Sequence, residues 1–498
     1  MIQYKSLTPI LMPISLSDVL WTGDEFAKAI GGKGPTHWHA TGVSIDTRTL
    51  QPGDVFIALR GPHFDGATFI DAAWNLGACA VVVHDDGAVS SDPAHPTLAV
   101  PDTFQALNQL ATAARKRFTG PLLALTGSVG KTSVKDGLAH VLSLQGLTSA
   151  SRNSLNNHLG VPLSLARLPK KARFGIFEIG MNHSGEITEL VDLIRPGVTL
   201  ITQVSYQHGA FFSCLDDIIS AKTEIFSAPG PLVGIIPRDS PHYETFVRNG
   251  ERYGHMTQWI TFGQHPESTI RLISKQPGPF ERTRIRISIQ DSIMTYDWSL
   301  RGDHTIYNSL AIVAGALALG ADMSRVMETM ESIQLSSGRG NTRTIGGISI
   351  VDDAYNAAPA SMLAALRTFS THVSTPNEQN RPLDHSGKRY ILLGQMRELG
   401  GQSHACHQAL VPLIHACKAD GVWLCGSEFK PFLKDIPNLL GYGDSVHDLI
   451  PDIVSTLRPG DTILIKGANS MKLCTLISAL ETAWGKAQPL DSSNPNIK

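Results

Sequence analysis

The chain has 498 residues, of which 42% are hydrophobic and 17% charged, and its formal net charge at pH 7 is −2. This composition is typical of a globular protein of about three domains, and the near-neutral charge argues against a nucleic-acid surface or a polybasic membrane patch. No apolar run reaches the roughly 18 residues of a membrane span and no secretory leader is recognisable, so we expect a cytoplasmic protein. Its six cysteines are scattered, and we expect free thiols.

The first predicted block, residues 1–118, is a small α/β domain. The turn Gln51–Pro52–Gly53–Asp54 separates two strand-like runs at its start, and apolar runs alternate with helical patterns after it. The predicted strands lie within 42–61 and at 78–83 and 97–100, and the helices at 67–76 and 102–118.

A phosphate-binding loop opens the second block, residues 119–334. The apolar run 121–125 predicts a buried strand, and the helical spacing of apolar residues predicts a helix that begins near Lys131. A glycine turn between them can point N–H groups at phosphates, Lys131 can reach a β/γ-phosphate, and Thr132 can ligate Mg²⁺. The full Walker spacing lacks its first glycine, since Leu125 stands there. We therefore expect nucleotide binding at Thr126, Gly127, Ser128, Val129, Gly130, Lys131, Thr132 and Ser133.

The rest of the second block predicts a mostly parallel sheet. Buried-strand runs lie at 174–180, 198–204, 233–237 and 259–263, followed by an antiparallel patch within 268–301 and a helix at 305–320. Ligands bind beyond the carboxyl ends of parallel strands, and Glu178 lies near one such end with His208 just past the next. If these strands flank the loop, Glu178 suits Mg²⁺ and His208 faces the nucleotide; otherwise His208 is a surface-loop histidine.

Two cations allow two interpretations each. Lys222 has apolar helical neighbours and, on spacing alone, is a snorkelling lysine. Arg339, between Gly338 and Gly340, either reaches a γ-phosphate or is a solvated linker charge.

The third block, residues 335–498, contains four apolar strands with helical segments between them and predicts a second doubly wound, Rossmann-like domain. VDDAYNAAP (351–359) places Asp353 and Tyr355 at a strand end. There they could bind and stack on a ribose, or form an ordinary Asp- and Asn-rich turn.

Taken in order, several segments resemble the Mur ligase family over residues 40–475. They are GVSIDTRTLQPGDVFIALRGPHFDG (42–66), TGSVGKTS, NSLNNHLGVPLSLARL (153–168), FEIGMNHSGEI (177–187), AKTEIF, GRG, VDDAYNAAPASM (351–362), LLGQMRELG (392–400) and IKGANSM (465–471). Each is weak alone, whereas the set in this order is specific.

The resemblance implies a three-domain α/β enzyme: a small N-terminal domain for the UDP end of the substrate, a central P-loop ATPase, and a C-terminal Rossmann-like domain for the amino substrate. It implies an ATP- and Mg²⁺-dependent ligase that forms an acyl phosphate and joins D-alanyl-D-alanine to a UDP-N-acetylmuramoyl-tripeptide. That reaction serves peptidoglycan synthesis, and through it cell-wall biogenesis, cell shape and cell division. We expect a monomer without nucleic-acid or membrane partners.

The family motifs also imply residue roles. Lys131, Glu178, His208 and Lys222 match catalytic positions. The implied metal ligands are Thr132, Glu178, His208 and a carbamylated Lys222. Asn308 is expected to meet the adenine, whereas Arg339, Asp353 and Tyr355 meet the γ-phosphate and ribose. The residues expected to face the UDP-substrate are Ser44, Asp46, Arg48, Asp65, Asn156 and Asn157.

The chain departs from the family pattern at several positions: Thr305 follows His304 in place of asparagine, Ala354 and Ala358 replace a serine and an asparagine, Gln395 replaces an acid, and YQHGAFF (206–212) lacks a proline. Two alternatives remain. One is another Mur-type or folylpolyglutamate-type ligase, and the other is a nucleotide-binding scaffold without catalysis.

Overall fold

The computed structural model describes residues 19–61, 64–86, 92, 94–207, 209–278, 282–290, 292–334, 337–371 and 387–485. Its contacts group the chain into two units. The first is Met1–Gly120 with His158–Ala172, and the second is Pro121–Asn157 with Arg173–Lys498.

The first unit is built on a four-stranded parallel sheet in the order β3-β4-β7-β8. Its β-branched run Val81–Val83 is fully inside, as expected of a parallel strand covered on both faces. The strands are β3 (Gly42–Ser44), β4 (Asp54–Ile57), β7 (Ala80–His84) and β8 (Thr97–Val100), with short antiparallel pairs β1 (Trp21–Thr22) with β2 (His39–Ala40) and β5 (Arg60–Gly61) with β6 (Phe64–Asp65). The helices are α1 (Gly23–Ile30), η1 (Gly66–Phe69), α2 (Ile70–Asn75) and α3 (Thr103–Arg117).

A later helix, α5 (Gly160–Ala166), also belongs to this unit by its contacts. It packs on α3, the indole of Trp21 donates to the carbonyl of Ala166 at 2.9 Å, and Arg167 donates to the carbonyl of Val43 at 2.6 Å. The segment 158–172, which lies inside the sequence range predicted for the central domain, therefore contributes to the core of the N-terminal unit.

The second unit begins with a nine-stranded sheet in the order β10-β11-β9-β12-β13-β14-β15-β16-β17. Neighbours are parallel from β10 to β15 and antiparallel from β15 to β17, which confirms the predicted mixed sheet. The strands are β9 (Leu122–Thr126), β10 (Thr148–Ala150), β11 (Phe174–Glu178), β12 (Val198–Ile201), β13 (Leu232–Pro237), β14 (Met256–Gly263), β15 (Ile270–Pro277), β16 (Thr283–Ile289) and β17 (Ser292–Trp298).

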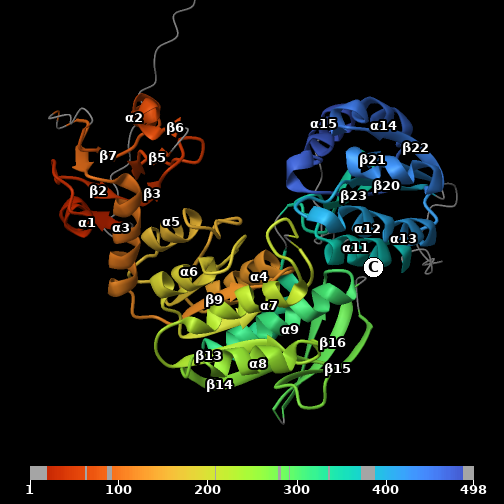
Figure 1. The fold of residues 1–498 in the computed structure, drawn as a ribbon, viewed down its shortest axis with the longest axis horizontal. Helices are drawn as coiled ribbons and strands as arrows, with labels where there is room; N and C mark the ends of the chain where they lie inside the picture. The colour runs from red at the N-terminus through yellow and green to blue at the C-terminus, as the bar shows by residue number, and fades with distance from the viewer. Residues whose placement is uncertain are drawn as a thin grey trace, which may run out of the picture. The chain divides into compact units, whose positions relative to one another are not determined.

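Helices cover this sheet, and α4 packs against the long apolar helix α9 (Figure 1). The core between them is aliphatic, with Leu138 and Ile312 fully or almost fully buried. The helices are α4 (Lys131–Ser143), α6 (Glu186–Ile194), α7 (Leu215–Thr223), η2 (Glu224–Ser227), α8 (Tyr243–Glu251), α9 (Asp303–Ala318), α10 (Met323–Thr329) and η4 (Met330–Ser332).

The C-terminal part of the second unit has a six-stranded sheet in the order β18-β19-β23-β20-β21-β22, parallel except for the edge strand β18. Helices α11 and α13 lie on one side of it and α14 and α15 on the other, the doubly wound layering that the sequence predicts (Figure 1). The strands are β18 (Asn341–Ile345), β19 (Ile348–Asp353), β20 (Arg389–Gly394), β21 (Gly421–Cys425), β22 (Leu439–Gly443) and β23 (Thr462–Lys466). The helices are α11 (Pro359–Thr371), η5 (Gly400–Gln402), α12 (Ser403–Gln408), α13 (Val411–Ala416), η6 (Ser427–Asp435), η7 (Val446–Asp448), α14 (Ile450–Thr456), η8 (Asn469–Met471) and α15 (Cys474–Trp484).

The predicted α/β class is confirmed, and so are the four predicted C-terminal strands. The two edge strands β18 and β22 were not predicted, because one is polar (NTRTI) and the other contains two glycines (LLGYG). All six cysteines are unpaired, as expected. No helix among the described residues is long and apolar enough to cross a membrane.

Candidate active site

The loop between β9 and α4 has the geometry of a phosphate-binding turn. Gly127 and Gly130 have φ values of 150° and 90°, and a Cβ atom would lie 1.9 Å from the Thr202 hydroxyl at the first position and 2.4 Å from the Asn308 side-chain oxygen at the second. Only glycine fits these two positions. The segment after β12 holds the loop in place, since the amide of Ser128 donates to the carbonyl of Gln203 at 2.8 Å.

Two lysines converge on one carbonyl beneath this loop. The Nζ atom of Lys131 lies 2.8 Å from the Gly127 oxygen, and the Nζ atom of Lys222 lies 3.0 Å from the same oxygen. Lys222 is only 1% exposed, so the interpretation of Lys222 as a snorkelling lysine is wrong. Burial, and then the neighbouring charge of Lys131, hold the pKa of Lys222 well below its ordinary value of 10.5. Burial of the Lys131 ammonium likewise lowers its pKa, with Glu178 opposing the shift and Arg339 adding to it.

Glu178 lies at the end of β11. Strand β9, which leads into the phosphate loop, pairs with β11 on one side and with β12 on the other. The prediction that these two strands flank the loop is therefore confirmed. The Thr132 hydroxyl donates to one carboxylate oxygen of Glu178 at 2.7 Å, and the Asn156 amide donates to the other at 2.7 Å. A hydroxyl and a carboxylate held together at a phosphate loop are the hard oxygen ligands that Mg²⁺ takes alongside phosphates and water.

The chemistry of this donor set fits magnesium better than a transition metal. Among the described residues no group of three or more His, Cys, Asp or Glu side chains could hold a metal ion. His208, the remaining predicted ligand, lies outside the described residues.

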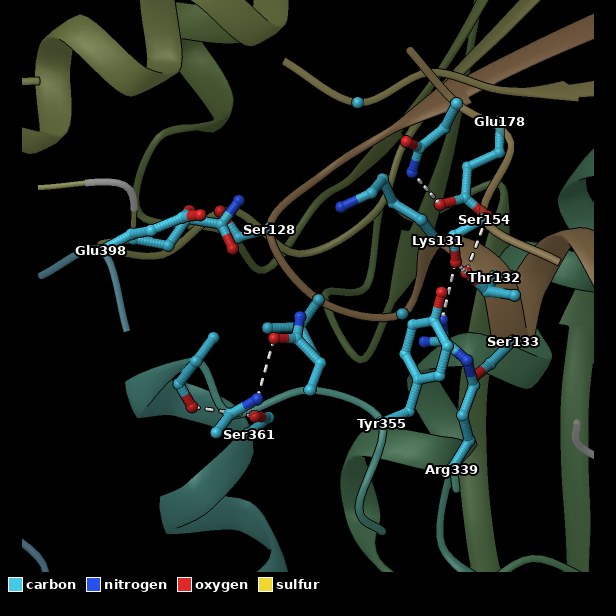
Figure 2. Close-up of a pocket in the computed structure, with 18 of the residues that line it drawn as sticks. Ser128, Lys131, Thr132, Ser133, Ser154, Glu178, Arg339, Tyr355, Ser361 and Glu398 are labelled. Atoms are coloured by element: carbon cyan, nitrogen blue, oxygen red, sulfur yellow. Dashed lines mark hydrogen bonds between the residues drawn. The ribbon is translucent and has the colours of Figure 1, made fainter. Parts of the chain in front are cut away.

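Ser154 connects this part of the site with the C-terminal sheet and was not predicted. Its hydroxyl lies 3.4 Å from that of Thr132 and accepts a hydrogen bond from Arg339 at 3.1 Å. The Arg339 guanidinium also lies over the ring of Tyr355, 4.2 Å from its centroid. Figure 2 shows Thr132, Glu178 and Ser154 side by side, with Arg339 reaching Ser154 and Tyr355 next to Arg339. Arg339 is therefore a cation of the site, and not a solvated linker charge.

Asp353 lies directly opposite Lys466 in the pairing of β19 with β23. The buried Lys466 ammonium donates to the Asp353 carboxylate at 2.7 Å and to the carbonyl of Asn356 at 2.9 Å. His304 lies in the same cavity, and burial lowers its pKa. Lys466 belongs to the segment IKGANSM, but the sequence did not show that it contacts Asp353.

These residues line one cavity of about 380 Å³. From the predicted ATP and metal set, it is lined by Ser128, Val129, Gly130, Lys131, Thr132, Ser133, Glu178, Lys222, Asn308, Arg339, Asp353 and Tyr355, together with the predicted substrate residues Asn156 and Asn157. Thr126 and Gly127 lie beneath it: the Thr126 hydroxyl donates to the carbonyl of Ile179, and Gly127 supplies the carbonyl for the two lysines.

A second cavity, of about 620 Å³, is lined in part by Val129, His304 and Asn308, which also line the first. Its other walls include Phe262, Tyr307 and Leu363, so it is more apolar and of a size for a flat aromatic base. Asn308 lies against Gly130 of the loop, between the two cavities, where an amide could meet a nucleotide base.

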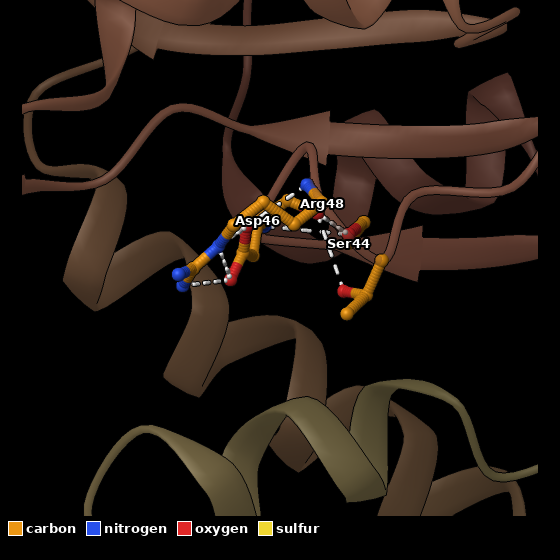
Figure 3. A network of polar contacts seen from close by, with 4 residues as sticks. Ser44, Asp46 and Arg48 are labelled. Carbon is orange, nitrogen blue, oxygen red and sulfur yellow. Dashed lines mark hydrogen bonds and ion pairs between the residues drawn. The ribbon is translucent and has the colours of Figure 1, made fainter. Parts of the chain in front are cut away.

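Four of the six residues predicted to face the UDP-substrate belong to the first unit: Ser44, Asp46, Arg48 and Asp65. The Arg48 guanidinium folds back onto the Asp46 carboxylate, with a shortest contact of 2.6 Å, and the Ser44 hydroxyl donates to the carbonyl of Asp46 at 3.0 Å (Figure 3). Asp65 accepts from the amide of Ala67 and from the side chain of Arg60. Asp46 and Asp65 are thus each paired with an arginine.

The departures from the family pattern fall in different surroundings. Ala358 lines the first cavity, whereas Gln395 is buried and accepts a hydrogen bond from the amide of Glu428 at 3.2 Å. Arg397 and Glu398, two and three residues after Gln395, line the cavity instead. The side chain of Gln395 therefore contacts the chain at Glu428 and is not part of the cavity lining.

Comparisons with known proteins agree with this architecture. Three family models match: the Mur ligase family, catalytic domain, at residues 39–115, the Mur ligase middle domain at 125–316, and the Mur ligase, glutamate ligase domain at 338–469. UDP-N-acetylmuramoyl-tripeptide–D-alanyl-D-alanine ligase of Rickettsia prowazekii is 30% identical over 463 residues, which cover 92% of this chain and 99% of that protein. The Escherichia coli ligase of the same name is 30% identical over 448 residues, or 88% of this chain and 93% of that one. A crystal structure of MurF from Acinetobacter baumannii has a TM-score of 0.76 at 26% identity and covers 93% of this chain and 99% of its own.

Proposed function

Because the chain belongs to the Mur ligase family, we propose that it joins D-alanyl-D-alanine to a UDP-N-acetylmuramoyl-tripeptide at the expense of ATP, in peptidoglycan precursor synthesis. The near-full-length similarity to ligases of that name supports the choice of substrates. The dependence on ATP and a UDP-substrate favours a cytoplasmic reaction, and one copy of the chain carries all three family regions, so a monomer suffices.

One observation supports this proposal above the others. Lys131 and the Thr132–Glu178 pair face Arg339 and Asp353 across a single cavity of about 380 Å³. A phosphate loop alone would support only nucleotide binding. Cations and polar groups from the C-terminal sheet at the same cavity are what transfer of a phosphoryl group to an acceptor requires.

In this proposal the terminal carboxylate of the tripeptide attacks the γ-phosphorus of ATP. The bond from that phosphorus to the bridging oxygen breaks, ADP leaves, and an acyl phosphate forms. The amine of the dipeptide then attacks the acyl carbon, loses a proton, and expels phosphate to give the amide. Lys131 and Arg339, which line the same cavity, would stabilise charge on the transferred group.

Magnesium, bound at Thr132 and Glu178, would neutralise charge on the phosphate oxygens. We place a carbamylated Lys222 and His208 with these ligands. Carbamylation needs a neutral amine, and the burial that lowers the pKa of Lys222 supplies one. The carbamate would turn this neutral amine, which lies among cations, into an anion that binds metal.

The nucleotide base is assigned to the second cavity, with Asn308 at its entrance, and the ribose to Asp353, whose carboxylate Lys466 orients. The amino substrate is assigned to the C-terminal wall of the first cavity around Ala358, Arg397 and Glu398. The UDP end of the tripeptide substrate is assigned to Ser44, Asp46, Arg48 and Asp65 of the first unit, with Asn156 and Asn157 facing the peptide.

The test is a reconstituted reaction with ATP, Mg²⁺, UDP-N-acetylmuramoyl-tripeptide and D-alanyl-D-alanine, followed for phosphate and for the UDP-pentapeptide. The expected result is one phosphate for each amide, with little phosphate when the dipeptide is replaced by glutamate or D-alanine. Equal phosphate release with glutamate would favour another Mur-type or folylpolyglutamate-type ligase. Tight nucleotide binding without turnover of any amine would favour a scaffold without catalysis.

A further inference from the structure

Lys135 lies one helical turn after Lys131 on α4 but does not line the cavity. Its side chain is 1% exposed. The ammonium donates to the carbonyls of Ser151 and Asn153 at 2.7 and 2.6 Å and lies 3.0 Å from the Asp136 carboxylate. A lysine ammonium has three N–H donors, so these three acceptors satisfy it completely.

The two carbonyls belong to the loop of residues 151–157, which we call the ligand loop. Its Ser154 hydroxyl contacts Thr132 and Arg339, and its Asn156 amide holds Glu178. Asn153 in this loop has a left-handed φ of 49°, a conformation that asparagine tolerates better than most residues other than glycine. Lys135 donates to the carbonyl of Asn153 itself and to that of Ser151 two residues earlier, so it holds this turn from outside the loop.

Stability alone is a poor reason to bury this cation. Desolvation of a buried ammonium is expensive, and apolar residues of similar volume often replace buried ion pairs without loss. The ammonium instead fixes the position of the loop, since it holds two loop carbonyls at hydrogen-bonding distance from the helix that also carries Lys131 and Thr132.

We propose that Lys135 is a positioning residue that sets the ligand loop against α4 and so orients Glu178 and Thr132 toward the magnesium–nucleotide complex. This rests on the proposed nucleotide site, though not on the identity of the amino substrate. Lys135 touches neither nucleotide nor metal in this proposal and acts only through Ser154 and Asn156.

The experiment compares Lys135→Met with Asp136→Asn. Methionine keeps the length and apolar volume of the stem but loses all three donors. Asparagine at 136 removes the carboxylate and leaves both carbonyl contacts of Lys135 intact, so it is the matched control. For each full-length variant, binding of a fluorescent ADP analogue is titrated at a series of Mg²⁺ concentrations, and the thermal midpoint is measured without ligand.

Loss of a partner that orients a metal ligand typically weakens metal affinity about 10- to 100-fold. We expect Lys135→Met to raise the Mg²⁺ concentration for half-maximal binding by about that factor, while binding at Mg²⁺ saturation approaches wild type. Asp136→Asn should leave the Mg²⁺ dependence unchanged. A lower thermal midpoint with an unchanged Mg²⁺ dependence in Lys135→Met would overturn the proposal, since it would show a purely structural role.

A second variant keeps the proposal testable if Lys135→Met does not fold. Lys135→Gln retains an uncharged donor, and we expect a Mg²⁺ dependence between those of wild type and Lys135→Met; wild-type behaviour in Lys135→Gln would contradict the role of the clamp. The binding assay contains no amino substrate, so failure of the dipeptide assignment would leave this result unaffected. Failure of wild type to bind the ADP analogue would instead reject the proposed nucleotide site.

Discussion

Replacing Lys222 with alanine tests the carbamylation proposal most directly. Lys222 is 1% exposed, its Nζ atom lies 3.0 Å from the Gly127 oxygen, and among the described residues it makes no ion pair with a carboxylate. If Lys222 carries the anion that holds metal against the phosphate being transferred, its loss removes one preorganised electrostatic contact. Such a contact contributes about 3 kcal/mol to the transition state, or roughly 150-fold in turnover at 1.36 kcal/mol for each factor of ten.

The assay is steady-state phosphate release in bicarbonate-containing buffer, with and without a short carboxylic acid such as acetate or propionate. The acid should enter the space left by the side chain in Lys222→Ala and restore part of the lost turnover. Lys222→Met is the matched control: its side chain fills that space, so we expect a similar loss without rescue. Turnover of Lys222→Ala within threefold of wild type would refute carbamylation of Lys222. So would a large loss of turnover that no acid rescues, if removal of bicarbonate also leaves the wild-type turnover unaffected.

Three further predictions concern other groups of the site. Lys131→Ala should lower turnover at saturating ATP by about 100-fold or more with an unchanged thermal midpoint, because it removes the positive charge that stabilises the phosphoryl group during transfer. Near-normal turnover would exclude this role. Arg48→Ala should raise KM for the UDP-substrate and leave KM for ATP unchanged, since Arg48 is 87% exposed and belongs to the first unit; an equal rise for both ligands would contradict the assignment. In bicarbonate-free buffer, the unfolding free energy of wild type should rise with pH between the lowered pKa of Lys222 in the folded protein and the value of 10.5 in the unfolded chain, because only the unfolded chain binds a proton at Lys222 in that range. Denaturant titrations should show a smaller rise for Lys222→Met. Identical pH profiles for the two proteins would show that Lys222 is protonated in the folded protein.

Local signals were enough to predict the phosphate loop. Strand, glycine turn and helix are contiguous in sequence, so apolar spacing and the two glycines place Lys131 and Thr132 correctly without any knowledge of the sheet. The interior position of β9 in the nine-stranded sheet could not be read in this way, since buried parallel strands all appear as similar apolar runs. The sequence therefore predicts that Glu178 follows a strand, while only the structure shows that this strand pairs with β9.

Contacts between distant segments account for what the sequence missed. Ser154 and Lys466 are ordinary residue types with no local signature, and they matter because Arg339 and Asp353 meet them across 185 and 113 residues. The same holds for Lys222, whose apolar helical neighbours suggest a snorkelling side chain. Spacing shows that a helix face is apolar but does not say whether another layer covers it, and here the phosphate loop does.

The arrangement of charge at the loop explains why so much polar structure is needed around it. Lys131, Lys222 and Arg339 line one cavity, and each of the two lysines has its pKa lowered in part by a neighbouring cation. Each cation makes protonation of its neighbours less favourable. The two lysines donate to the Gly127 carbonyl and Arg339 donates to Ser154 of the ligand loop, and among the described residues none of the three forms an ion pair with a carboxylate. A nucleotide phosphate among these cations supplies the missing negative charge, which makes nucleotide affinity and the pKa values of both lysines thermodynamically linked. Binding of ATP should therefore raise the pKa of Lys131, and conversion of Lys222 to an anion should raise it further, so the two events reinforce the protonated form of Lys131 that the transfer step requires.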